Sequence, residues 1–283
     1  MKHFDDRVAA ITGAASGMGR TLALDLARRG CHLSLSDVDA EGLAETASQA
    51  SRPGLTVTTS RIDVADRGQV EAWADQVLAD HGRVNLIFNN AGVGLGAGVE
   101  SMAYEDLEWL MGINFWGVVH GTKAFLPHLK AAGEGHVVNT SSIFGLAGIP
   151  SQSAYNAAKF AVRGFTESLR IELDLERCGV SATSVHPGGI KTNIARRARM
   201  HADLGVDAEE ARRDIERLFI TSPEAAARTI IRAVQLNKRR ALVGPDAYAF
   251  DLLVRLSPGL AQRLIGRGAS RTLPADAPVT GVE

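Results

Sequence analysis

The chain has 283 residues, 45% of them hydrophobic, which is enough for a sizeable buried core. Its formal net charge is -1, so the charge balance gives no indication of a nucleic-acid partner. No stretch approaches the roughly 20 apolar residues that span a bilayer, and no apolar signal region precedes the first strand pattern. We therefore expect a cytoplasmic protein with no membrane partner.

Cys31 and Cys178 lie far apart and outside any metal-binding spacing, so they are interpreted as small apolar residues in a reducing compartment, and no metal site is predicted.

Short apolar runs alternate with amphipathic helical patterns along the chain. The runs predict strands over Val8–Thr12, His32–Ser36, Leu55–Ile62, Val84–Asn89, His136–Thr140, Val180–His186 and Ala241–Val243. The patterns between them predict helices near 17–29, 39–51, 66–81, 104–132, 153–177 and 223–237. This alternation predicts right-handed βαβ units, and hence an α/β fold in which helices cover both faces of a doubly wound parallel sheet.

No internal repeat or linker interrupts the chain, so we expect a single domain over residues 1–267. The region 189–222 breaks the rhythm and is expected to hold one or two short helices. Because it follows the carboxyl end of a strand, we expect it to help form a substrate site. Apolar residues at helical spacing predict a C-terminal helical extension over 245–267, broken at Pro258. The tail 268–283 is expected to be disordered.

The extension could pack on the core, on a partner subunit or over the pocket as a lid. A role at a membrane surface is a weaker alternative.

A glycine-rich turn follows the first predicted strand. Glycines there allow a tight turn and a close approach of the backbone to a pyrophosphate, which would lie at the N-terminus of the next helix. The residues expected to contact this pyrophosphate are Gly13, Ser16, Gly17, Met18 and Gly19.

Asp37 ends the second predicted strand, 24 residues after Gly13. A carboxylate at this position accepts hydrogen bonds from ribose hydroxyls and repels a 2′-phosphate, which favours NAD(H) over NADP(H). The alternative is that Asp37 caps the next helix, a role that Asp39 could fill instead.

Tyr155 and Lys159 are four residues apart in a predicted helix, so they share one face. An ammonium near a phenol favours the phenolate and lowers the tyrosine pKa from about 10 toward working pH. A tyrosine tuned in this way can exchange a proton with an alcohol or ketone. The spacing alone is common on helix surfaces, so its meaning depends on the motifs upstream.

Several motifs occur in a fixed order over roughly residues 5–245. They are Thr12-Gly13-x3-Gly17-x-Gly19, Asp63-Val64, Asn89-Asn90-Ala91-Gly92, Asn114, Ser141-Ser142, Tyr155-x3-Lys159, and Pro187-Gly188 with Thr192. In this order the chain resembles the short-chain dehydrogenase/reductase family. The resemblance implies a single Rossmann-type sheet of seven strands. It also implies a homodimer or homotetramer in which helices 104–132 and 153–177 form the dimer-forming pair.

The resemblance also implies contacts to the cofactor beyond the glycine turn. They are Asp63 and Val64 at the adenine, Asn90, Ala91 and Gly92 along the nucleotide cleft, Tyr155 and Lys159 beside the ribose, and Pro187, Gly188, Ile190 and Thr192 at the nicotinamide. Asn90 is also expected to support the central sheet. Lys191 matches no family position and is expected to be a surface residue.

The catalytic set implied by the resemblance is Asn114, Ser142, Tyr155 and Lys159. Ser142 would stabilise the substrate oxygen, Tyr155 would exchange the proton, Lys159 would lower the Tyr155 pKa, and Asn114 would hold a water. Neighbouring residues of a strand point to opposite faces, and the family spacing favours Ser142 over Ser141. In the alternatives, Ser142 caps a helix entry, Asn114 satisfies the backbone of a kinked helix, or Tyr155 lies at a subunit face.

The substrate is less clearly indicated. Apolar candidates for the pocket are Phe144, Leu146 and Ile149, together with the loop 94–99 and the segment 193–219. They suggest a hydrophobic, steroid-like or long-chain substrate, although ordinary loop packing explains them equally well. Arg196, Arg197 and Arg199 are expected to form a solvated helix face.

The sequence thus predicts an NAD(P)-dependent oxidoreductase that interconverts a secondary alcohol and a ketone. The alternatives are a non-catalytic dinucleotide-binding sensor of the same fold, and an epimerase or dehydratase of the related extended branch, which has a different glycine spacing.

Overall fold

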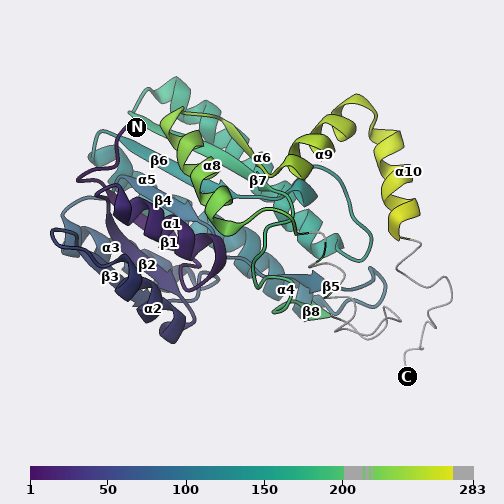
Figure 1. Ribbon diagram of the computed structural model, residues 1–283, viewed down its shortest axis with the longest axis horizontal. Helices are drawn as coiled ribbons and strands as arrows, with labels where there is room; N and C mark the ends of the chain where they lie inside the picture. The colour runs from purple at the N-terminus through teal and green to yellow at the C-terminus, as the bar shows by residue number, and fades with distance from the viewer. Residues whose placement is uncertain (201–212, 214–216, 218, 270–283) are drawn as a thin grey trace.

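Seven parallel strands form the central sheet, in the order β3-β2-β1-β4-β6-β7-β9. The computed structural model describes residues 1–200, 213, 217 and 219–269 (Figure 1). The strands are β1 (Val8–Thr12), β2 (His32–Asp37), β3 (Val57–Arg61), β4 (Leu86–Asn89), β6 (Gly135–Thr140), β7 (Val180–Pro187) and β9 (Arg240–Val243). The predicted α/β fold with a doubly wound parallel sheet is confirmed.

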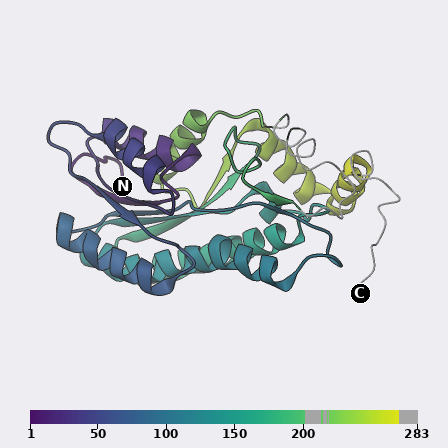
Figure 2. The same ribbon diagram turned by 90° about the horizontal axis from the view of Figure 1, so that it is seen from below.

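Helices cover both faces of this sheet. Figure 2 shows α1 (Gly17–Arg28), α2 (Ala40–Ala50) and α8 (Pro223–Gln235) on one side, and α3 (Arg67–His81), α5 (Gly117–Ala131) and α6 (Ser153–Glu176) on the other. Successive side chains of β1 alternate between the two layers, so that Ala9 and Ile11 join one hydrophobic core while Val8 and Ala10 join the other. A strand buried on both faces needs apolar residues throughout, which explains the continuous apolar runs in the sequence.

Three local features differ from the predicted elements. The third strand begins at Val57 and not at Leu55, because the Leu55 amide closes a turn onto the Arg52 carbonyl oxygen at 3.1 Å while its side chain still packs on the core. The predicted helix 104–132 consists of α4 (Tyr104–Met111), a π-helical turn η1 (Gly112–Trp116) and α5. A small second sheet, of β5 (Leu95–Gly96) and β8 (Arg199–Met200), is too short to leave a sequence pattern.

The C-terminal extension forms two helices, α9 (Pro245–Leu256) and α10 (Pro258–Ala269), which break at Pro258 as predicted. They extend away from the sheet (Figure 1). Five of their large apolar side chains are between 42% and 76% exposed, namely Tyr248, Leu252, Leu256, Leu260 and Leu264. The described helices include none that is long and apolar enough to cross a membrane.

The expected disorder from Gly268 onward is wrong for Gly268 and Ala269, which end α10. Residues 270–283 lie outside the described residues, as does most of 201–218, where the short helices of the substrate loop were expected.

Two buried histidines make the fold sensitive to acid. His136 in β6 and His186 in β7 are fully enclosed, and burial lowers the pKa of His136 to about 3 and that of His186 to about 4. Below about pH 6.5 the unfolded chain therefore binds protons that the folded chain does not. We expect the free energy of unfolding to fall by about 1.4 kcal/mol per pH unit for each histidine between about pH 6 and pH 4.

Thermal melts between pH 7.5 and pH 4.5 test this expectation. His136→Asn removes one of the two titrating groups, so the melting temperature should depend less steeply on pH than in the wild type. The exposed His3 provides the control, and His3→Asn should leave the slope unchanged. An unchanged slope in His136→Asn would contradict the assignment.

Candidate active site

The glycine turn after β1 leaves no room for side chains. Gly13 and Gly17 have φ angles of 67° and 53°, in the left-handed region that glycine adopts without strain. A Cβ on Gly13 would lie 2.8 Å from the Ala91 Cα atom, and a Cβ on Gly19 would overlap the Gly13 carbonyl oxygen. The turn therefore brings bare backbone to the N-terminus of α1, where the first amide groups have no partner within the helix and can bind an anion.

The ends of β1 and β4 are tied together beside this turn. The Thr12 hydroxyl accepts hydrogen bonds from the amides of Asn90 (2.9 Å) and Ala91 (3.0 Å). The Asn90 side chain donates in return to the carbonyl oxygens of Thr12 (3.1 Å) and Gly13 (3.3 Å). Asn90 thus links the two central strands, and Ala91 and Gly92 follow directly at the edge of the cleft.

Asp37 belongs to the turn and not to the cap of α2. Its Oδ2 accepts the Ala15 amide at 2.9 Å and its Oδ1 accepts the Asp39 amide at 3.0 Å. Asp39 itself caps α2 by accepting the Gly42 amide at 3.0 Å. The interpretation of Asp37 as a helix cap is therefore wrong, and the carboxylate lies beside the glycine turn, where a ribose contact was expected.

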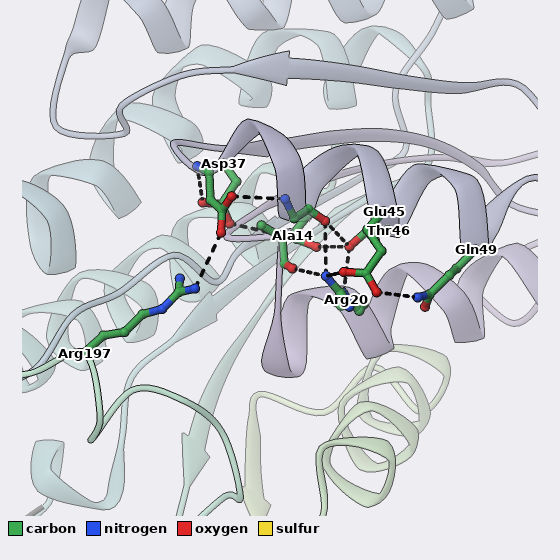
Figure 3. A network of polar contacts seen from close by, with 10 residues as sticks. Ala14, Arg20, Asp37, Glu45, Thr46, Gln49 and Arg197 are labelled. Carbon is green, nitrogen blue, oxygen red and sulfur yellow. Dashed lines mark hydrogen bonds and ion pairs between the residues drawn. The ribbon is translucent and has the colours of Figure 1, made fainter.

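Arg20 holds the same turn through contacts on the side of α2. The sequence analysis did not predict this role. Figure 3 shows its guanidinium between α1 and α2, where it donates to the Ala15 carbonyl oxygen (2.6 Å) and the Thr46 hydroxyl (2.9 Å) and pairs with Glu45 (2.7 Å). Thr46 donates in turn to the Ala14 carbonyl oxygen at 2.9 Å. A positive side chain in the first turn of a helix opposes the helix dipole, and this was the only local signal of a special role.

Arg197 and Arg199, in the segment after β7, form ion pairs with distant acidic residues. Arg197 pairs with Asp39 at 3.5 Å and so reaches the glycine turn (Figure 3). Arg199 pairs with Asp106 at 2.7 Å and lies over the Trp109 ring, 3.7 Å from its centroid. All three arginines are exposed, as expected, but they lie in turns and in β8 and not on a helix. Lys191 is exposed as well.

Asp63 and Val64 lie between β3 and α3. The Asp63 side chain is exposed and accepts the Ala65 amide at 2.9 Å, which shapes the turn. Val64 is buried against α5, since a Cβ on Gly117 would lie 2.7 Å from the Val64 Cγ2 atom. Both residues therefore follow directly after the carboxyl end of β3.

Tyr155 and Lys159 share one face of α6, as their spacing predicts. The Lys159 Nζ atom lies 5.6 Å from the centroid of the Tyr155 ring and donates to the Thr140 carbonyl oxygen at 2.9 Å. The Phe144 ring stands perpendicular to that of Tyr155, with 5.9 Å between centroids. Tyr155 lies half-buried and Lys159 is fully enclosed.

Burial dominates the pKa values of this pair. It raises the pKa of Tyr155 to about 12, against the opposing effect of hydrogen bonding with Ser142, and lowers the pKa of Lys159 to about 8. The expectation that the Lys159 charge lowers the Tyr155 pKa below its usual value is therefore wrong for the protein alone. At neutral pH the phenol is protonated and Lys159 is charged.

The two serines after β6 face in different directions. Ser141 donates to the Lys159 carbonyl oxygen at 2.7 Å and so holds α6. Ser142 lies close enough to Tyr155 to oppose the rise in the pKa of its phenol. The Ser142 Oγ atom accepts the Phe144 amide at 3.1 Å at the start of a 3₁₀ turn, η2 (Ile143–Gly145). The capping role considered for Ser142 is therefore real, and it coexists with the contact to Tyr155.

Asn114 lies in the π-helical turn η1, and such turns are frequent at functional sites. Its side chain accepts the Val93 amide at 2.8 Å and donates to the Val93 carbonyl oxygen at 2.9 Å. The Asn114 side chain thus hydrogen-bonds to the backbone of the loop after β4 and not to the backbone of its own helix. A Cβ on Gly92 would lie 3.2 Å from the Asn114 Oδ1 atom and 3.6 Å from the Lys159 Nζ atom, so these three residues meet.

The segment after β7 crosses toward the glycine turn. The Gly188 amide donates to the Val243 carbonyl oxygen at 2.9 Å, and Ile190 forms a β-bridge with Thr221. A Cβ on Gly17 would lie 3.1 Å from the Thr192 Cγ2 atom. The segment from Pro187 to Thr192 therefore runs from the end of β7 to the N-terminus of α1.

The three predicted pocket residues have different surroundings. Phe144 lies against Tyr155. Leu146 is only 6% exposed, and the Ile149 carbonyl oxygen accepts from the Asn156 side chain at 3.1 Å in the turn before α6. In the loop 94–99, Leu95 and Ala97 are buried in a small cluster that Tyr155 also contacts.

Known proteins resemble this chain along most of its length. The family model described as short chain dehydrogenase matches residues 7–203. The putative oxidoreductase SadH of Mycobacterium tuberculosis is 48% identical over 278 residues, which cover 97% of this chain and 99% of that protein. Levodione reductase of Leifsonia aquatica is 36% identical over 223 residues, 78% of this chain and 81% of that protein.

A crystal structure of a short-chain dehydrogenase/reductase from Burkholderia phymatum in complex with NAD is 33% identical, with a TM-score of 0.83 over 92% of this chain and 96% of that one. The family match, the relatives and the shared fold lead to one conclusion. This chain is an oxidoreductase that belongs to the short-chain dehydrogenase/reductase family.

Proposed function

We propose that the protein interconverts a secondary alcohol and a ketone, with NAD(H) as the cofactor. The observation that supports this proposal is that Ser142, Tyr155 and Lys159 lie together, in a chain whose glycine turn after β1 can bind an anion. A non-catalytic sensor would need the turn but not a phenol beside a serine, with an enclosed lysine on the same helix face.

The residues present fit a dinucleotide. Cβ atoms on Gly13 and Gly19 would collide with neighbouring backbone, so only glycines allow the tight turn at the N-terminus of α1, which is the place for the pyrophosphate. Asp37 would accept the ribose hydroxyls, and its charge would repel the additional phosphate of NADP(H). Asp63 and Val64 would hold the adenine, and Pro187 to Thr192 would hold the nicotinamide. When bound, the nicotinamide supplies or accepts the hydride.

The chain's own residues would handle the proton. Ser142 would donate a hydrogen bond to the substrate oxygen and stabilise the charge that develops there. With a pKa of about 12 the Tyr155 phenol is protonated, so it is ready to donate a proton to a ketone oxygen. Lys159, charged below its pKa of about 8, would stabilise the phenolate that remains and would hold the nicotinamide ribose. Asn114, which meets Lys159 through Gly92, would hold a water that carries the proton onward.

We further propose a hydrophobic substrate, because the Phe144 ring stands against Tyr155. The name of the related levodione reductase specifies a dione, which supports a ketone. Residues 1–267 would form one domain that assembles as a homodimer or homotetramer in the cytoplasm. Free cysteines at 31 and 178 support a reducing compartment. Assembly is supported by the exposed apolar side chains next to and on the two long helices, namely Trp116, Phe160, Ile171 and Leu175.

A panel of secondary alcohols and ketones, with steroids, long-chain ketones and cyclic diketones among them, tests the proposal by following NADH and NADPH absorbance. We expect turnover of an apolar ketone with NADH, and kcat/KM at least about tenfold lower with NADPH because of the Asp37 charge. A preference for NADPH would overturn the role of Asp37. If NADH bound but no carbonyl compound reacted, the sensor would be the better description.

A further inference from the structure

A carboxylate from the C-terminal extension reaches the segment that follows β7. Asp246 lies in the first turn of α9, and its Oδ2 atom accepts the Gly189 amide at 2.6 Å. The two residues are 57 positions apart, so the contact joins the extension to the Pro187–Thr192 segment. A hydrogen bond from an amide to a carboxylate is stronger than one between neutral groups.

Two glycines make room for this carboxylate. A Cβ on Gly188 would overlap both Asp246 carboxylate oxygens. A Cβ on Gly244, which has a φ of 100°, would overlap the Asp246 Oδ1 atom and lie 2.6 Å from the Thr221 hydroxyl oxygen. The carboxylate therefore occupies the space that side chains at positions 188 and 244 would need, and the Gly188 backbone can pass only because it carries none.

Backbone hydrogen bonds also hold the Pro187–Thr192 segment. The Gly189 carbonyl oxygen accepts the amides of Ile220 (3.1 Å) and Thr221 (3.0 Å), and the Lys191 amide donates to the Thr221 carbonyl oxygen at 2.9 Å. Those contacts come from the end of the region 189–222. Asp246 adds the side-chain contact that links the Gly189 amide to α9, so its loss would leave this amide to find another partner.

The Asp246 Oδ1 and Thr221 Oγ1 atoms are both buried and have no hydrogen-bond partner among the described residues. Buried polar atoms without a partner are rare and costly in native proteins. One carboxylate oxygen of Asp246 is thus committed to the Gly189 amide, and the other lies buried on the side of Gly244.

We propose that Asp246 is a positioning residue for the nicotinamide end of the cofactor site. By holding the Gly189 amide it sets the path of Gly188 to Ile190, which under the proposed function pack on the nicotinamide. The inference rests on that proposed function. It assigns a role to the C-terminal extension that its sequence pattern did not suggest: the first turn of α9 completes the cofactor site, whatever its exposed leucines contact.

Binding of two ligands separates this role from simple stabilisation of the fold. NADH carries the nicotinamide, and ADP-ribose lacks it. In Asp246→Ala we expect the Kd for NADH to rise about tenfold, as the loss of one charge-assisted hydrogen bond would produce. The Kd for ADP-ribose should stay within about twofold of the wild type, because the glycine turn and Asp37 are distant in the fold from α9. Asp246→Asn keeps an acceptor oxygen and should fall between the two.

Asp251→Asn is the matched control. Asp251 lies on the same helix and pairs with Arg240 at 2.7 Å and Arg255 at 3.0 Å. Its replacement loosens α9 without touching Gly189, so NADH affinity should match the wild type. Equal weakening of NADH and ADP-ribose in Asp246→Ala would show a merely structural role and overturn the proposal, as would unchanged affinity for NADH.

A second measurement needs no cofactor. Hydrogen exchange of peptides that contain Gly189 should be faster in Asp246→Ala and Asp246→Asn than in the wild type and Asp251→Asn. Unchanged exchange would overturn the positioning role even if the variant bound NADH poorly. If the wild type bound neither NADH nor ADP-ribose, the proposed function would fail, and the role at the nicotinamide would fail with it. If the wild type bound NADH and the Asp246 variants bound it equally well, only the positioning role would fail.

Discussion

Tyr155→Phe is expected to reduce kcat by about 1,000-fold or more, the scale of a lost general acid or base. The substitution removes only the hydroxyl. The ring that packs edge-on against Phe144 remains, and so does the enclosed Lys159 behind it. The affinity for NADH should therefore stay within about twofold of the wild type, since Lys159 and the glycine turn are unchanged. Turnover of the best ketone found in the panel and NADH fluorescence titration measure the two quantities.

Tyr104→Phe is the control for this prediction. Tyr104 is 79% exposed at the start of α4, and loss of its hydroxyl should leave kcat unchanged. Substantial turnover by Tyr155→Phe would mean that another group transfers the proton, and the assignment of the active site would be wrong. A parallel loss of turnover and NADH binding would instead point to collapse of the site.

Gly19→Ala is expected to open the glycine turn. The added Cβ would overlap the Gly13 carbonyl oxygen and lie 2.8 Å from the Asn90 side-chain nitrogen. The overlapping atom is backbone that cannot rotate away, so the turn and the start of α1 must separate. We expect NADH affinity to fall about 100-fold or more, and the free energy of unfolding to fall by about 2 kcal/mol.

Gly266→Ala is the matched control in helix α10. Gly266 is exposed, and a Cβ there would meet nothing within 4 Å. Alanine is favoured over glycine within a helix by about 1 kcal/mol, so this variant should be slightly more stable and bind NADH normally. Calorimetric melts and NADH titration of both variants provide the comparison. Normal NADH binding by Gly19→Ala would contradict the close approach of the turn to the cofactor.

Contacts between residues that are distant in the sequence explain why only the structure could decide between some of the roles considered for Asp37 and Ser142. Asp37 and Asp39 were equal candidates for capping α2 in the sequence, since either carboxylate can reach an amide of the first helical turn. The structure assigns Asp39 to the cap and Asp37 to Ala15, because β2 delivers Asp37 beside the turn that follows β1. Ser142 likewise serves as a cap and as a partner of Tyr155.

What the sequence determined by itself was local. The patterns are apolar runs that cover both faces of a strand, glycines in a strand-to-helix turn, and Tyr155 four residues before Lys159. Each of them depends on the geometry of a single strand, turn or helix. The seven strands, the flanking helices and the shared face of the Tyr–Lys pair follow from that geometry, and the structure confirms them. A resemblance in motif order could add roles, but it could not say which distant side chains would meet.

Tertiary structure decided the properties that depend on neighbours far along the chain. Burial raises the Tyr155 pKa and lowers that of Lys159, where the spacing alone predicted a lower Tyr155 pKa. Arg197 reaches Asp39 across 158 positions, and Asp246 reaches Gly189 across 57. Desolvation and long-range pairing depend on how layers of the sheet and helices close over one another, and no short window of sequence contains that information.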